Sequence, residues 1–380
     1  MAQKTAVVRR TPYRSFALGS LPKGCRLCAA GKKSVFFITG VCNAGCFFCP
    51  ISEQKKNNDV IFINERPVKK NNDVIGEINA CRSEGVGITG GDPLARIDRT
   101  CAYIRKLKER YGKGFHIHLY TPLALVTDDK LKRLHGAGLD EVRFHLFLND
   151  RKRWPILEKA TGYSWDVGVE IPVLPKMERA TKELIDFIAG KVKFLNLNEL
   201  EYSDTNASGM ERFGYATKGA ASYAISGSEE LAKRLLCYCK GRIPSVHYCT
   251  ASLKDSIQMA RRIRRRAKTV RKGYQSLTRE GMIRTGALYI PELAPGIGYR
   301  KQLTQENRKN ALAALRAALP KVRELDSTQG MDIDTGKPRI TASPAFIRKS
   351  KRKLKELGLL PAIVEEYPTW DAFEVSVDLL

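Results

Sequence analysis

Short apolar runs alternate with longer amphipathic stretches between residues 34 and 198, and this alternation sets the expected architecture. Each apolar run has the length and composition of a strand, and each amphipathic stretch has the spacing of a helix with one buried face. A repeated succession of strand and helix is typical of parallel sheets built from βα units. The predicted strands span residues 34–39, 85–89, 115–121, 141–147, 168–174 and 192–198, and helices are predicted at 98–111, 128–136 and 181–190.

One face of these strands is polar, although helix-covered parallel strands are usually apolar on both faces. Within 115–121, the alternate residues His116, His118 and Tyr120 share one face, and the apolar residues between them share the other. We therefore expect a barrel with a polar lumen that binds a substrate. Its catalytic candidates are His116, His118, Tyr120, Arg143, His145 and Glu170. The alternative interpretation is a set of satisfied core polar residues, or strands of the opposite phase.

The chain changes character after residue 200. A loop at 202–209, a helix at 228–241 and a short strand near 245–249 precede a helix at 251–272 with a narrow apolar stripe. Gly- and Pro-rich sequence then precedes helices at 306–319 and 345–358 and two further strands, which indicates a small α+β unit. The predicted segments are an N-terminal segment (1–33), a barrel core (34–200), an extension (201–272) and a C-terminal domain (273–380).

The composition indicates a folded, strongly basic protein without an export or membrane signal. Its 380 residues are 43% hydrophobic and carry a formal charge of +26. We expect a cytoplasmic location, where ten cysteines are more plausible as metal ligands and core thiols than as disulfides. Eight of the twelve residues from 261 to 272 are Arg or Lys, so this helix is a candidate RNA-binding surface. The alternative is a solvated helix face paired with acids elsewhere in the fold.

Three cysteines in the stretch "GVCNAGCFFCP", Cys42, Cys46 and Cys49, follow the first predicted strand. Their C-x3-C-x2-C spacing directs three sulfurs at one centre, and three thiolates are one short of the four that complete a zinc or iron–sulfur site. A [4Fe–4S] cluster held in this way has one iron without a protein ligand. That iron is open to a substrate or a cofactor.

The loop "SVFFITGVCNAGCFFC" and the later "GITGGDPL" resemble motifs of the radical SAM superfamily. The resemblance implies a partial (β/α)6 barrel and a [4Fe–4S] cluster on Cys42, Cys46 and Cys49 that cleaves S-adenosylmethionine to a 5′-deoxyadenosyl radical. A ferredoxin- or flavodoxin-like donor would supply the electron. The implied cofactor-binding residues are Phe48 near the adenine, Gly90, Gly91 and Asp92 near the methionyl ammonium, and Thr121, Asn196 and Asn198 on later strands. Asp92 stands where the family has Glu, which shortens its reach.

Five further cysteines suggest a second metal site. Cys25 and Cys28 precede the first strand, and Cys237, Cys239 and Cys249 follow the last. Closure of a barrel would bring the two groups together, so the first pair and two of the later three could hold an auxiliary [4Fe–4S] cluster or a structural zinc ion. Cys239 and Cys249 are preferred over Cys237, and scattered reduced thiols are the alternative. Cys81 and Cys101 lie in apolar helix stripes and are expected in the core.

Within the superfamily, the cysteine block and "VGITGGDPL" resemble an archaeal group related to pyruvate formate-lyase activating enzymes. The leading hypothesis is a radical enzyme, and the basic helix slightly favours RNA, either tRNA or rRNA, as its substrate. A glycyl-radical enzyme activase, or another enzyme acting on a protein or a small metabolite, is the alternative. A non-catalytic RNA-binding zinc protein is the second alternative, although it leaves the "GGDPL" motif unexplained.

Overall fold

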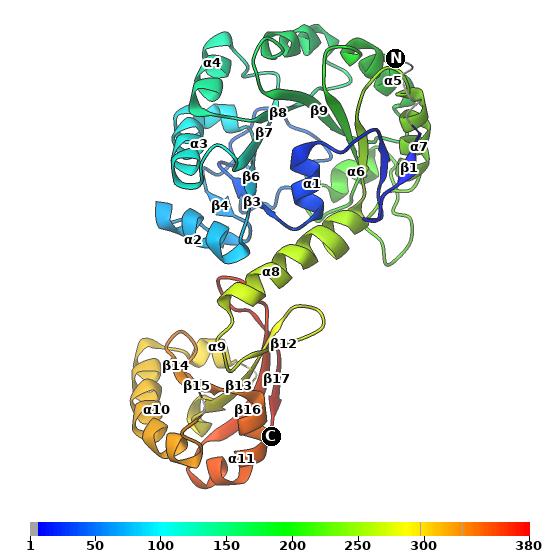
Figure 1. The fold of residues 1–380 in the computed structure, drawn as a ribbon. Coiled ribbons are helices and arrows are strands. Elements are labelled where there is room, and N and C mark those ends of the chain that lie inside the picture. Colours follow the sequence, from blue (N-terminus) through cyan, green and yellow to red (C-terminus); the bar gives the residue numbers. More distant parts are fainter. Residues whose placement is uncertain (1–6, 297, 329) are drawn as a thin grey trace. The chain divides into compact units, whose positions relative to one another are not determined.

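The computed structural model describes residues 7–296, 298–328 and 330–380, and it forms two compact units, Met1–Arg262 and Ile263–Leu380 (Figure 1). The predicted boundary between residues 272 and 273 lies further along the chain. The difference arises because α8 (Ala260–Val270) continues through the division. No helix in the described part of the chain is long and apolar enough to cross a membrane.

The first unit is built on a parallel sheet that contains all six predicted strands. These are β3 (Lys33–Phe37), β6 (Gly85–Thr89), β7 (His116–Pro122), β8 (Glu141–His145), β9 (Asp166–Pro172) and β10 (Phe194–Asn198), each paired in parallel with the next. β11 (Val246–Cys249) continues the sheet beside β10. The residues that we expected to follow the barrel as a separate short strand are therefore part of its sheet.

Short antiparallel strands extend both ends of this sheet. β2 (Phe16–Leu18) and β1 (Arg9–Arg10) follow β11, whereas β4 (Phe62–Ile63) and β5 (Arg66–Pro67) follow β3. Because β1 and β5 end the strand order without pairing to each other, the sheet is an open, partial barrel. The carboxyl ends of its parallel strands, where such folds place their sites, meet at one rim.

Helices cover the outer face of the sheet (Figure 1). They are α2 (Asn71–Cys81), α3 (Ile97–Tyr111), α4 (Asp128–Ala137), α5 (Glu178–Ile188) and α7 (Ser228–Tyr238), with 3-10 helices at Pro93–Arg96 and Arg151–Ala160. In α4, Thr127 caps the first turn by accepting a hydrogen bond from the Lys130 amide, and Gly138 ends the helix at φ +95°. Outward strand residues such as Ile117 and Leu119 are fully buried beneath the helices, each contributing about 1.5–3 kcal/mol.

Helix α1 (Lys23–Ala29) lies inside the curve of the sheet rather than outside it (Figure 1). A Cβ atom on Gly24 would lie 2.4 Å from Arg143 Nη2 and 2.6 Å from His118 Nδ1, so α1 rests directly on inward side chains of β7 and β8. The polar lumen that the strand pattern predicts therefore exists, but the chain's own N-terminal helix occupies this part of it.

The segment after β10 contains α6 (Ala207–Arg212) and a π-helix at Leu253–Met259 that continues into α8. The sequence predicted one regular helix over residues 251–272. A π-helix is rare and often marks a functional site.

The second unit is an antiparallel sheet covered by two long helices. Its strands are β12 (Ser276–Leu277), β13 (Ile283–Tyr289), β14 (Asp332–Asp334), β15 (Arg339–Ala342), β16 (Leu360–Glu366) and β17 (Glu374–Leu379), in the order β14-β15-β13-β16-β17 with β12 beside β13. Its helices are α9 (Tyr299–Gln302), α10 (Gln305–Leu325) and α11 (Pro344–Glu356), with a 3-10 turn at Pro291–Leu293. From β13 to β16 the β-α-β-β-α-β order gives a ferredoxin-like arrangement. Helix α10 passes its predicted end because it accommodates Pro320 and buries Val322 beyond it.

Candidate active site

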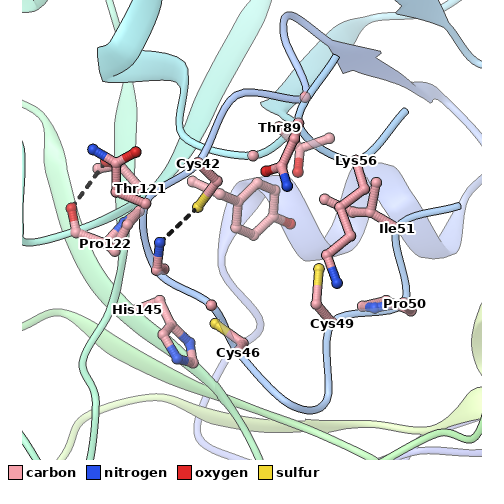
Figure 2. Close-up of a pocket in the computed structure, with 18 of the residues that line it drawn as sticks. Cys42, Cys46, Cys49, Pro50, Ile51, Lys56, Thr89, Thr121, Pro122 and His145 are labelled. Carbon is pink, nitrogen blue, oxygen red and sulfur yellow. Dashed lines mark hydrogen bonds between the residues drawn. The ribbon is translucent and has the colours of Figure 1, made fainter. Parts of the chain in front are cut away.

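The cysteine loop that follows β3 forms one wall of a cavity of about 460 Å³. Cys42, Cys46 and Cys49 all line this cavity, and Figure 2 shows their sulfurs on the loop that borders it. The Ala44 amide donates a hydrogen bond to Cys42 Sγ over 3.4 Å. Burial raises the pKa of the Cys46 thiol to about 12. The loop thus gathers three thiols around one space, as the spacing predicts.

Gly90 and Gly91 follow β6 and line the same cavity. The backbone at this point is hydrogen-bonded to the start of the cysteine loop. The Gly91 amide donates a hydrogen bond to the Thr39 carbonyl, and the Asp92 amide donates one to the Val41 carbonyl, both over 2.8 Å. A Cβ on Gly90 would lie 2.2 Å from the Thr39 oxygen, and Gly90 has φ +149°. The glycine pair is therefore required in order to seat the cysteine loop against the second strand, a contact that the motif alone did not reveal.

Asp92 is buried behind the cavity and does not line it. Its carboxylate caps the Pro93–Arg96 turn by accepting from the Leu94 amide over 3.0 Å, and it accepts from the Thr121 hydroxyl over 2.7 Å. Burial raises the pKa of Asp92, and these two hydrogen bonds oppose that rise. Thr121 does line the cavity. Asp92 is thus linked to the cavity through its hydrogen bond with Thr121. Its direct contact with a bound ligand stays a prediction.

Phe48 and His145 form an aromatic wall of the cavity, with ring centroids 5.6 Å apart. Because a carbonyl only accepts, His145 Nδ1 donates to the Glu170 oxygen over 3.3 Å, which leaves Nε2 as an acceptor. Burial lowers the pKa of His145 to about 4. The ring is therefore neutral at pH 7. Tyr120 also lines the cavity, so two of the six catalytic candidates reach it.

The other catalytic candidates form a buried network beneath α1. Glu141 accepts from Arg143 over 2.5 Å and lies 3.4 Å from His116 Nε2 and 3.6 Å from His118 Nδ1. Lys33 Nζ lies 2.6 Å from His116 Nδ1, and burial lowers the pKa of Lys33 to about 7. None of these residues lines the cavity, and the role of His116, His118 and Arg143 in orienting a substrate stays a prediction.

Glu141 and Lys33 also belong to this network, although the sequence did not lead us to predict them as site residues. Glu141 stands two residues before Arg143 on β8, so the same alternation that selected Arg143 places it on the lumen face. His116, His118 and Glu141 bring three donor atoms within 4.8 Å of one another. A metal ion is disfavoured there, because Lys33 and Arg143 already place positive charge beside the donors.

Glu170, Asn196 and Asn198 are also paired with one another rather than with the cavity. The Glu170 carboxylate accepts from Asn196 Nδ2 over 2.8 Å and from Asn198 Nδ2 over 2.9 Å, and Arg143 Nη1 donates to it over 2.8 Å. The two asparagines do not line this cavity, and their contact with a cofactor stays a prediction. Instead, they hold the Glu170 carboxylate in place beside Arg143.

Comparison with known proteins identifies the family. A model described as "Radical SAM superfamily" matches residues 36–171. A "putative glycyl-radical enzyme activating enzyme" from Methanocaldococcus jannaschii is 43% identical over 369 residues, which cover 94% of this chain and 92% of that protein. The chain belongs to the radical SAM superfamily. Its predicted family, partial-barrel fold and enzyme class are confirmed.

Two solved structures show more distant similarity to this radical SAM enzyme. Coproporphyrinogen III oxidase from Escherichia coli is 10% identical with a TM-score of 0.37, over 89% of this chain and 93% of that one. Methylornithine synthase is 13% identical with a TM-score of 0.38, over 58% of this chain and 71% of that one.

The cysteine loop fits the cofactors of the family, a [4Fe–4S] cluster and S-adenosylmethionine. Its three thiols face one cavity that also has backbone-lined and aromatic walls. In the described part of the chain, only His116, His118 and Glu141 bring three His, Cys, Asp or Glu donor atoms within 4.8 Å of one another. At least two of the loop's three sulfurs are therefore farther apart than the roughly 3.8 Å that tetrahedral zinc–sulfur bonds of 2.3 Å require. This spacing suits donors around a multi-iron cluster better than donors around one zinc ion.

The remaining cysteines of this radical SAM enzyme separate into three groups. Cys81 and Cys101 are fully buried in the core, as predicted. Cys237 is exposed on α7. Cys239 is buried at the end of that helix, where burial raises the pKa of its thiol and the charged groups that act on it are Arg242 and Asp186. Cys25, Cys28 and Cys249 face the lumen. Burial raises the pKa of the Cys25 and Cys249 thiols, and the charges of neighbouring cysteines raise it further. Cys249 therefore remains a partner for the first pair, whereas Cys237 and Cys239 belong to another part of the fold.

Some basic side chains in and after α8 are engaged within the protein. Arg262 is 7% exposed and donates to Asn64 and Glu65. Arg266 is 9% exposed and donates to the Pro368 carbonyl. Lys272, beyond the end of the helix, pairs with Asp332. Arg261, Arg264, Lys268 and Arg271 are exposed, so RNA binding by residues 261–272 stays a prediction.

Proposed function

We propose that this radical SAM enzyme is a glycyl-radical enzyme activase, which removes a hydrogen atom from the Cα of a glycine in a partner protein. The proposal is carried by the 43% identity, across 94% of the chain, to a protein named as a putative enzyme of that kind. This substrate was an alternative in the sequence reading. RNA, which the basic helix slightly favoured, gains no support from the comparisons.

The walls of the cavity support a polypeptide substrate. Of the described residues that line it, only Lys56 has a side chain that is charged at neutral pH, and much of the remaining wall is backbone, proline and aromatic surface such as Phe147. A charged metabolite needs several paired charges, whereas a backbone segment needs few. The cavity of about 460 Å³ must also hold the cluster and S-adenosylmethionine, so a loop of a partner protein would approach them at its mouth.

The lumen beneath the cavity gives little support to a small polar substrate. Its charged side chains already pair with one another, and α1 occupies the space above Arg143 and His118. A substrate that entered there would have to displace α1 and compete with these buried ion pairs, and breaking such a pair costs about 3–5 kcal/mol. Substrate binding at the rim avoids this cost.

In the proposed reaction, the chain's own residues hold and shield the reacting groups. The bound cluster and S-adenosylmethionine supply the radical that abstracts the hydrogen atom. Cys42, Cys46 and Cys49 would hold the cluster, and Phe48 would cover the adenine. Neutral His145 presents Nε2 toward the cavity as an acceptor for an amide N–H. The apolar wall excludes water from the radical.

The test follows the hydrogen atom. Cells that express this chain are grown in heavy water, and their protein, RNA and small-molecule fractions are incubated separately with the reconstituted enzyme, dithionite and S-adenosylmethionine. Mass spectrometry then measures deuterium in the 5′-deoxyadenosine produced. We expect deuterium from the protein fraction, and the same result when only glycine carries the label at Cα.

The alternatives give different outcomes in this experiment. Deuterium from the RNA fraction alone would support RNA as the substrate and overturn the proposal. Deuterium from the small-molecule fraction alone would support a metabolite as the substrate and also overturn it. The Cys46→Ala variant is the control for cluster dependence. The Cys101→Ser variant, which changes a core thiol distant in sequence from the motif, controls for the loss of any cysteine.

A further inference from the structure

Three thiols outside the cysteine loop converge in the barrel lumen. Cys25 and Cys28 lie about one turn apart on α1, and Cys249 ends β11. Asn196, whose side chain contacts Cys25, lies on β10, where Asn198, two residues further along the same face, is the register partner of Cys249. The three thiols come from opposite ends of the barrel sequence, and the folded sheet brings them together.

Nitrogen donors surround two of these sulfurs. Asn196 Nδ2 lies 3.3 Å and Arg143 Nη2 lies 3.6 Å from Cys25 Sγ, and Gln258 Nε2 lies 3.7 Å from Cys28 Sγ. N–H groups that point at sulfur stabilise a thiolate, and they commonly support thiolate ligands of metals. Gln258 belongs to the π-helix at Leu253–Met259, which begins just after Cys249.

His247 adds a fourth donor on the same strand face as Cys249. It is 2% exposed, its Nε2 lies 3.1 Å from the Ser15 hydroxyl, and no described residue forms a hydrogen bond with its Nδ1. In the register of the sheet, His247 pairs with Asn196, the residue whose side chain contacts Cys25. A buried nitrogen without a partner costs about 1–3 kcal/mol, and a ligand would remove that cost.

We propose that Cys25, Cys28, Cys249 and His247 bind a second metal centre in the lumen. No three of these four donor atoms lie within 4.8 Å of one another, so they are too widely spaced for one zinc ion and suit an iron–sulfur cluster, which thiolate and imidazole ligands can hold. A [4Fe–4S]2+ cluster with three thiolates and a neutral imidazole has a net charge of about −1. The Arg143 guanidinium beside Cys25 places positive charge next to these ligands. The inference does not depend on the proposed substrate.

The decisive sample is a variant that lacks the ligands of the first cluster, with Cys42, Cys46 and Cys49 all changed to Ala. After anaerobic purification, zinc and iron are measured by plasma mass spectrometry and the absorption spectrum is recorded. We expect iron with an absorption band near 400 nm, where a zinc–thiolate site is colourless. A chain that retains less than about a tenth of an equivalent of iron, or that holds only zinc, would overturn the proposal.

Further variants locate the retained metal. Addition of Cys28→Ser or His247→Gln to the triple variant is expected to lower the metal content at least several-fold, because each change removes a ligand. Addition of Cys237→Ser is the matched control, since this exposed thiol on α7 lies outside the site, and it is expected to change nothing. Metal content that survives both Cys28→Ser and His247→Gln would place the metal elsewhere and contradict the assignment.

A measurement on the unmodified chain covers the case in which these variants fail to fold. Cys28 and Cys249 are partly exposed, so an alkylating reagent can reach them when no metal protects them. Mass spectrometry of the labelled protein, before and after mild chelation, reports each cysteine separately. We expect chelation to accelerate labelling of both residues at least tenfold and to leave Cys237 unchanged. Equal rates before and after chelation would refute the site.

Discussion

Replacement of Gly24 by Ala tests whether α1 is seated inside the barrel. The new Cβ would lie 2.4 Å from Arg143 Nη2, 2.6 Å from His118 Nδ1 and 3.0 Å from Glu141 Oε1. These atoms cannot retreat freely, because Glu141 and Glu170 hold Arg143 on two sides. The added methyl group must therefore move α1 or separate a buried ion pair.

The magnitude follows from these two ways of relieving the clash. Overpacking of a buried site costs about 1–3 kcal/mol, and the breaking of a buried ion pair costs about 3–5 kcal/mol. We expect the Gly24→Ala variant to lose about 2–4 kcal/mol of unfolding free energy, between these limits. Gly136→Ala is the matched control. Gly136 lies within α4 with no atom near the position of its missing Cβ, so the change should stabilise the protein by about 0.5–1 kcal/mol.

Chemical denaturation of the full chain, followed by circular dichroism, measures both variants. Opposite signs for Gly24→Ala and Gly136→Ala are the expected result, with an unchanged slope of the unfolding transition. A Gly24→Ala variant as stable as the parent would mean that α1 does not rest on Arg143 and His118. The placement of Cys25 and Cys28 in the lumen would then fail as well.

Three further outcomes are expected from the described contacts. The Cys46→Ala variant should lose the absorption band near 400 nm and the production of 5′-deoxyadenosine, whereas Cys101→Ser should keep both. Burial lowers the pKa of Lys33 to about 7, so between pH 7 and 10.5 the unfolded chain binds more protons than the folded chain. The free energy of unfolding should therefore rise with pH in this range, and it should rise less in Lys33→Met. Equilibrium denaturation at several pH values measures both. Arg262→Ala should destabilise the chain by about 1–3 kcal/mol, whereas the change of exposed Lys268 to Ala should cost less than about 0.5 kcal/mol. Thermal unfolding measures both variants, and equal losses of stability would contradict the buried pairing of Arg262.

The sequence was sufficient to predict the strands and the cysteine loop because both depend on local patterns. Alternation of apolar and polar residues located all six predicted strands and put His116, His118 and Arg143 on the inward face. The spacing of Cys42, Cys46 and Cys49 reflects a loop whose geometry depends on few other residues. Such features can be read from a short window of sequence.

Features that depend on distant residues could not be predicted in the same way. The burial of Arg262 requires Glu65, and the position of Asp92 behind the cavity depends on Thr121 from the next strand. Helix α1 offered only seven residues with two cysteines and no clear apolar stripe. No pattern in that segment predicts that it enters the lumen, because the residues it packs on are the histidines of β7 and the charged residues of β8.

The position of α1 changes what the polar strands mean for function. A lumen of unpaired charges would indicate a pocket for a small polar substrate, but here Arg143 pairs with both Glu141 and Glu170 under Gly24. The reactive space is thereby confined to the rim, between the cysteine loop and His145. A site at the rim is suited to a substrate that presents a protruding segment and keeps most of its mass outside the barrel. The same helix carries two of the four proposed ligands of the second metal centre, so loss of that metal should loosen α1 and reopen the lumen.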